Sequence, residues 1–102
     1  MNLDSGKVNR PQLIQLTNGE KYKAYQVTGY AGMIMPQHIS TKEAVVIIQE
    51  GKADLEINNS INHLKMNDVF VIPAGVHHSL AIKDRFKSIV IMENDSEIKF
   101  VK

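Results

Sequence analysis

The chain of 102 residues contains no cysteine. It therefore forms no disulfide and has no thiolate metal site, which fits a reducing compartment. Net charge is nearly absent as well, because 12 Lys and Arg side chains oppose 11 Asp and Glu side chains that are interspersed along the sequence. Without a block of charge, nothing indicates a nucleic-acid partner or a membrane surface.

Long hydrophobic segments are also missing. The longest apolar run has about five residues, whereas a membrane-spanning helix needs about 20. The N-terminus carries no apolar signal region. We expect a soluble, cytoplasmic protein of one domain.

What the sequence does contain is a series of short apolar or alternating segments separated by turn residues such as Asn18-Gly19 and Pro73-Ala-Gly75. No window shows a helical apolar period. The expected strands are 12–17, 22–28, 31–38, 44–50, 52–57, 61–65, 69–72, 79–82 and 86–92, with 97–101 as a further candidate. This pattern predicts an all-β sandwich or barrel.

Two of these segments, 44–48 and 69–72, are apolar at every position. Alternate side chains of a strand point to opposite faces, so both faces of these strands must be covered. One face would belong to the core. The other, which carries Val45 and Ile47, would meet either the N-terminal strands or a second subunit, and we expect a homodimer packed through a sheet face.

A first motif surrounds a histidine at the end of an expected strand. Gly32 is followed after five residues by His38, then by Ser40, Glu43 and Gly51. This spacing resembles the first signature of the cupin family, which reads glycine, five residues, His-x-His, three or four residues, glutamate, six residues, glycine.

A second motif lies further along the chain. Asn67, Pro73, Gly75, His78 and Ile82 stand at the positions of the second cupin signature. Asn67 replaces its first glycine, and Ile82 replaces its final asparagine.

The resemblance covers roughly residues 20 to 93. It implies a jelly-roll β-barrel, the double-stranded β-helix, in a single cupin domain over 1–102. The N-terminal strands would occupy 10–30 and the motif region 31–93.

The departures from the family pattern concern metal binding. Metal-binding cupins use both histidines and the glutamate of the first signature, plus the histidine of the second. Here Ser40 stands in place of the second histidine. Glu43 lies one residue too early, and the family position of the glutamate holds Ala44. A one-residue shift in a strand turns a side chain to the other face.

Three functions stay open. The preferred one is a module that binds a small molecule of unknown identity through His38, Ser40, His78 and Met92, without a complete set of metal ligands. The second is a metal-dependent enzyme, of dioxygenase or isomerase type, that uses His38, Glu43 and His78. The third is a structural dimer with a vestigial pocket. The cofactor is thus either a weakly held divalent metal or none.

Two geometric expectations follow from the motifs. If His38 and His78 share a pocket, they should lie within about 5 Å of each other. Asn67, standing where the family has glycine, should adopt a left-handed or turn conformation, because asparagine tolerates it best among the other residues.

Overall fold

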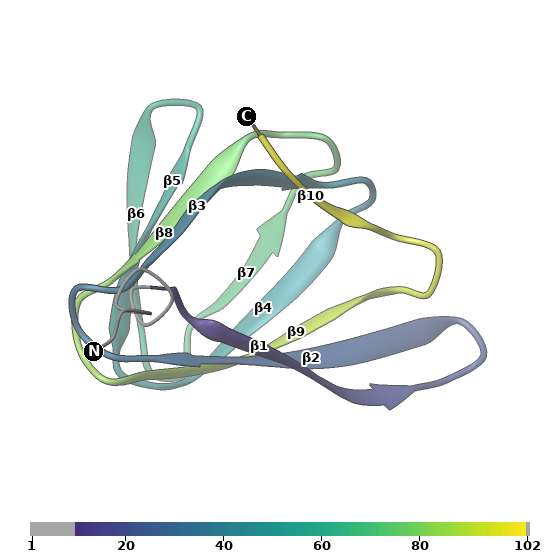
Figure 1. The fold of residues 1–102 in the computed structure, drawn as a ribbon, viewed down its shortest axis with the longest axis horizontal. Coiled ribbons are helices and arrows are strands. Elements are labelled where there is room, and N and C mark those ends of the chain that lie inside the picture. Colours follow the sequence, from purple (N-terminus) through teal and green to yellow (C-terminus); the bar gives the residue numbers. More distant parts are fainter. Residues whose placement is uncertain (1–9, 102) are drawn as a thin grey trace, which may run out of the picture.

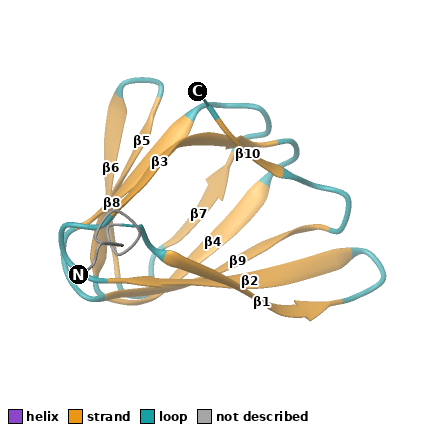
Figure 2. Ribbon diagram, in the orientation of Figure 1, coloured by secondary structure: helices purple, strands orange, loops and turns teal. Residues whose placement is uncertain are grey.

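The computed structural model describes residues 10–101, and the regular structure in this range consists of strands and turns (Figure 2). The strands are β1 (Gln12–Asn18), β2 (Tyr22–Gly29), β3 (Ile34–Ser40), β4 (Ala44–Glu50), β5 (Lys52–Ile57), β6 (Ser60–Lys65), β7 (Val69–Ile72), β8 (His78–Ile82), β9 (Phe86–Glu93) and β10 (Ile98–Phe100). Within this range there is no helix with the length and hydrophobicity that a membrane crossing requires.

The strands form two antiparallel sheets that face each other (Figure 1). One has the order β1-β2-β9-β4-β7 and the other the order β10-β3-β8-β5-β6. Strands distant in sequence are therefore neighbours, as in a jelly roll. The all-β, jelly-roll expectation is confirmed.

One strand begins later than the sequence predicts. β3 spans Ile34–Ser40 rather than 31–38. Gly32 has a positive φ of 94°, and the Met33 N–H donates to the Tyr30 carbonyl (3.1 Å), so that these residues form a turn. The strand also ends later than predicted, so that Ser40 lies inside it, two residues after His38.

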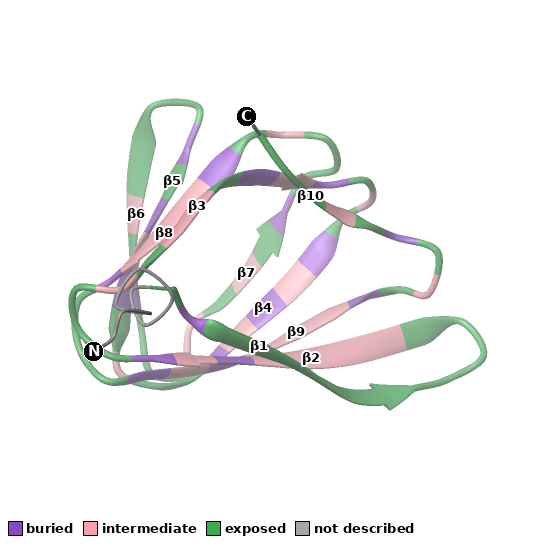
Figure 3. Ribbon diagram, viewed as in Figure 1, coloured by how far each residue is buried: buried purple, intermediate pink, exposed green. Residues whose placement is uncertain are grey.

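The core lies between the two sheets, and Figure 3 shows buried and less buried residues alternating along β4, as expected when alternate side chains of a strand point to opposite faces. Ile48 of β4, Leu55 of β5 and Phe86 of β9 are all at most 2% exposed. The intervening side chains of the same strands face outward. This alternation is the period-two pattern seen in the sequence, and it determines which residues line the interior.

The outward side of the first sheet is apolar over β4, β7 and β9. Val45 and Ile47 of β4 are half-buried there. In the β4–β7 register they stand opposite Val71 and Val69, and in the β4–β9 register opposite Ile91 and Ile89. These six residues form a continuous apolar surface, which we call the outer face.

The tight turn before β7 has the predicted backbone. Asn67 has a φ of 77°, in the left-handed region. Its N–H donates to the Ile48 carbonyl (2.8 Å), and the Ile48 N–H donates to the Asp68 carbonyl (2.9 Å). The expectation for Asn67 is thus confirmed. These two hydrogen bonds attach the β6–β7 turn to β4.

Candidate functional site

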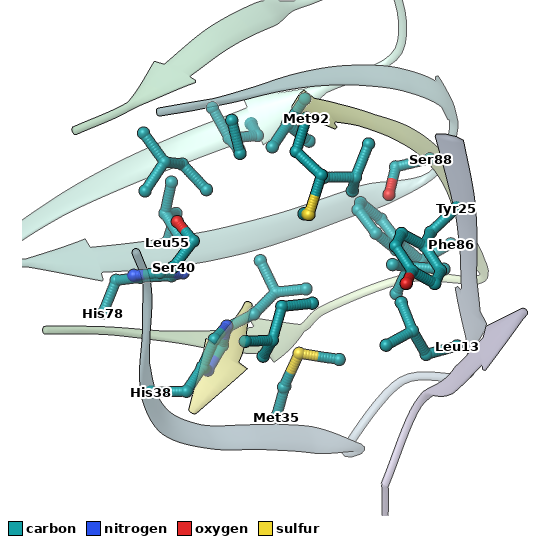
Figure 4. A pocket seen from close by; sticks show the side chains of 18 residues that line it. Leu13, Tyr25, Met35, His38, Ser40, Leu55, His78, Phe86, Ser88 and Met92 are labelled. Carbon is teal, nitrogen blue, oxygen red and sulfur yellow. The ribbon is translucent and has the colours of Figure 1, made fainter. Parts of the chain in front are cut away.

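A cavity of about 70 Å³ lies between the two sheets (Figure 4). On the same measure one water molecule needs about 10–15 Å³, so the cavity has room for several waters or one small organic molecule. Its lining is mostly apolar and comes from both sheets: Leu13, Tyr25, Val27, Met35, His38, Ser40, Ala44, Val46, Leu55, Leu64, Ile72, His78, Leu80, Phe86, Ser88, Val90, Met92 and Ile98. His38, Ser40 and His78 lie together at one end, whereas Tyr25 and Ser88 lie at the other.

The two histidines meet because β3 and β8 are neighbours. The antiparallel register places His38 directly opposite His78. Their ring centroids are 4.1 Å apart, with the ring planes inclined at 60°. The expectation that these rings approach within about 5 Å is therefore confirmed. Both are buried, His38 at 6% and His78 at 4% exposure.

Both rings are oriented by their own strands. His38 Nδ1 lies 2.7 Å from the Pro36 carbonyl oxygen, and His78 Nδ1 lies 3.0 Å from the Val76 carbonyl oxygen. A carbonyl oxygen only accepts, so Nδ1 carries the proton and donates in each ring. A neutral imidazole has a single N–H. Each Nε2 is consequently left with a free lone pair.

Burial keeps the rings neutral. It lowers the pKa of His38 and of His78 below the ordinary histidine value, because a buried imidazolium loses its hydration. The neighbouring His78 lowers the pKa of His38 further, while the bond to Pro36 acts in the opposite direction. At neutral pH the pair therefore presents two hydrogen-bond acceptors and no positive charge.

Ser40 is the third polar group at this end of the cavity. Because it follows His38 by two residues in β3, its side chain points to the same side. It is only 3% exposed. Its Oγ is the one fully buried side-chain nitrogen or oxygen of residues 10–101 that has no hydrogen-bond partner within the protein. Native proteins leave few such atoms, so this hydroxyl requires an explanation.

Met92 of β9 also lines the cavity and is 3% exposed. The structure thus brings together the four residues of the predicted ligand site, His38, Ser40, His78 and Met92, on one cavity. Whether they bind a ligand stays a prediction.

Glu43 is not part of this group. It is exposed and precedes the first residue of β4, whereas Ala44, 2% exposed, lines the cavity in its place. The one-residue offset in the motif therefore has the structural consequence expected of it. The alternative metal set of His38, Glu43 and His78 is not assembled.

The donor set does not fit the divalent metal that cupin signatures imply. Catalytic zinc and two-His-one-carboxylate iron sites need three protein ligands. Within residues 10–101 no cluster of three or more His, Cys, Asp or Glu side chains is placed to hold a metal ion. His77 is exposed, and the His63 side chain, 80% exposed, lies on β6 with Nδ1 2.7 Å from Asp54.

The contribution of β10 to the site was not predicted from the sequence. The ring of Phe100 in β10 lies 5.2 Å from that of His38, and Ile98 of the same strand lines the cavity. β10 pairs with β3 through Ile98–Ser40 and Phe100–His38. The segment 97–101 was recognised as a candidate strand, but nothing in its residues indicated which strand it would join.

Comparison with known proteins identifies the architecture. No protein-family model matches the sequence, and no curated protein matches it. Solved structures do match. A cupin superfamily protein from Desulfitobacterium hafniense superimposes with a TM-score of 0.76 at 22% identity, over 85% of this chain and 80% of that chain.

Two further structures extend the comparison. A protein with a double-stranded β-helix domain from Klebsiella pneumoniae has a TM-score of 0.81 at 14% identity, over 91% of this chain and 85% of that one. A DMSP lyase from Ruegeria pomeroyi has a TM-score of 0.84 at 22% identity, over 98% of this chain but only 56% of that chain. With its two five-stranded sheets and this likeness, the chain has the double-stranded β-helix fold that these structures have.

Proposed function

We propose that this protein binds a small molecule in the cavity around His38 and His78, without a complete set of metal ligands. The observation that carries the proposal is the unpartnered Ser40 Oγ inside a mostly apolar cavity. Leaving a buried hydroxyl unpaired costs about 1–3 kcal/mol. A ligand that supplies the missing partner would recover that energy, and the apolar walls would hold the rest of the molecule.

The preformed orientation of the two imidazoles supports the same proposal. Their Nδ1 bonds to Pro36 and Val76 are made within the protein, so a ligand need not order these rings when it binds. Preorganisation of this kind lowers the cost of binding.

We expect His38→Ala to weaken binding of a small aromatic probe, benzyl alcohol, by about tenfold or more, because it removes a polar partner and enlarges the cavity. His38 is buried beside His78 and Phe100. The variant should therefore also lose about 1–3 kcal/mol of unfolding free energy. Methyl NMR signals of Leu55, Val90 and Met92 report binding, and urea unfolding reports stability.

His63→Ala is the matched control, since His63 is exposed on β6. It should bind the probe like the native protein. Probe-induced shifts that fall outside the cavity, or unchanged affinity in His38→Ala, would contradict the proposed location.

We further propose that the protein forms a homodimer through the outer face. Val69 and Val71 are 62% and 49% exposed there, next to the half-buried Val45 and Ile47. The six residues of this surface include no charged side chain. Two identical copies can therefore meet about a two-fold axis without repulsion between like charges.

We expect Ile47→Lys to convert the dimer into a monomer, because it places an unpaired charge on each of two apposed apolar surfaces. Light scattering at tens of micromolar should give the mass of a dimer for the native protein and the mass of a single chain for the variant. Ile61→Lys is the control: Ile61 is 58% exposed on β6 of the other sheet, and its replacement should leave the dimer intact. A native protein that is monomeric under these conditions would refute the proposal.

A further inference from the structure

The polar groups of the cavity restrict the charge of its ligand. Within residues 10–101, no Asp, Glu, Lys or Arg lines the cavity. The only polar side chains are those of Tyr25, His38, Ser40, His78 and Ser88. An ionised ligand would therefore lose its hydration without meeting an opposite charge, which is costly in an apolar interior. The cavity favours an uncharged molecule.

The histidine end restricts the head group of that molecule. The Nδ1 atoms of both imidazoles are engaged with backbone carbonyls, so each ring offers only the lone pair of Nε2 to a ligand. The ring centroids are only 4.1 Å apart and both rings line the same cavity, so we infer that one small group in the cavity meets both acceptors. Such a group must donate two hydrogen bonds.

Ser40 adds a complementary requirement. Its hydroxyl is buried on the same strand face as His38 and has no partner. A hydroxyl can donate as well as accept. The protons of the ligand are already bonded to the two histidine nitrogens. The Ser40 hydroxyl therefore donates its own proton to an oxygen of the ligand.

We propose that the ligand is an uncharged molecule with an apolar body and a head group that donates to Nε2 of both His38 and His78 and accepts from the Ser40 hydroxyl. A primary carboxamide is the simplest such group: its NH₂ has two protons and its carbonyl oxygen accepts. This inference rests on the proposed small-molecule function and specifies the chemical class of the ligand. A carboxylate of the same shape is excluded, because it brings negative charge and no proton to two lone pairs.

Three probes of nearly the same shape test the inference. Benzamide, acetophenone and benzoate differ only in the group on the carbonyl carbon, which is NH₂, CH₃ or O⁻. Binding to the native protein at neutral pH is followed by calorimetry and by the ¹⁵N shifts of the histidine rings. We expect benzamide to bind about tenfold or more tightly than acetophenone, since two hydrogen bonds distinguish them, and benzoate to bind more weakly than either. The Nε2 signals should move with benzamide.

A histidine variant tests the acceptor itself. His78→Phe keeps a ring but removes Nε2, so benzamide should lose most of its advantage over acetophenone. His63→Phe, on the exposed side of β6, should keep that advantage in full. If His78→Phe does not fold, the comparison of the three probes on the native protein decides alone.

The outcomes separate the two proposals. If acetophenone or benzoate binds in the cavity as tightly as benzamide, the inference about the head group is wrong and the small-molecule function stands. If none of the three binds at millimolar concentration, the head-group inference is also overturned, and binding of benzyl alcohol then decides the proposed function separately.

Discussion

Replacing Gly51 with alanine is expected to unfold the protein or to remove more than about 4 kcal/mol of its unfolding free energy. Gly51 joins β4 to β5 with a φ of 81°, a left-handed conformation that alanine adopts only with strain. In addition, a Cβ at this position would overlap the backbone carbonyl of Arg85. Backbone atoms cannot rotate away as a side chain can, so the β4–β5 connection would have to shift.

Gly75→Ala separates the two causes. Gly75 has a similar φ of 72°, but a Cβ there would meet no atom within 4 Å. It should cost only the conformational strain, about 1–2 kcal/mol. Urea unfolding of both variants measures the difference, and equal losses for the two would show that the contact with Arg85 is unimportant. The total free energy of unfolding of most domains is only about 5–15 kcal/mol, so Gly51→Ala should lose a large part of its stability.

Replacing Ser40 with histidine is expected to complete a set of three zinc ligands at the histidine end of the cavity. Ser40 shares a strand face with His38 and lies on the same cavity as His78. A histidine at position 40 would supply a third imidazole, and three protein ligands plus water form the usual catalytic zinc site. The Nδ1 bonds of His38 and His78 to backbone carbonyls already hold these rings in the way that metal-binding histidines are held.

The measurement is thermal unfolding with and without zinc. A ligand present at 1,000 times its dissociation constant stabilises a protein by about 4 kcal/mol, so the melting temperature of Ser40→His should rise by several degrees or more with zinc. Thr41→His is the control, because Thr41 is exposed just after the end of β3 and does not line the cavity. If zinc has the same effect on both variants, or none on Ser40→His, the geometry assigned to this end of the cavity is incorrect.

The strands could be predicted because each is indicated by residues within or next to it in the sequence. Alternation in 52–57 and the turn residues around it define β5 without reference to any other part of the chain. The same holds for Asn67, whose conformation follows from its own side chain and its place in a turn. The pairing of His38 with His78 was accessible for a different reason: the resemblance to the cupin signatures supplied a long-range contact that no local pattern contains.

The remaining features depend on contacts between distant residues. The ring of Phe100, sixty-two residues away in the sequence, packs beside that of the buried His38. The missing partner of Ser40 Oγ is likewise a property of the whole cavity, since it depends on every side chain nearby. The orientation of the imidazoles depends on carbonyls whose directions are fixed only by the folded backbone.

The placement of β10 has a consequence for the speed of binding. This strand has three residues and lies at the end of its sheet, paired on one side only, with β3. Short edge strands open at low free-energy cost, while the rest of a sheet stays intact. Because Phe100 and Ile98 lie against the histidine end, detachment of β10 would uncover it. We expect the rates at which a ligand enters and leaves to follow the opening of this strand, and amide hydrogen exchange at 98–100 to slow when the cavity is filled.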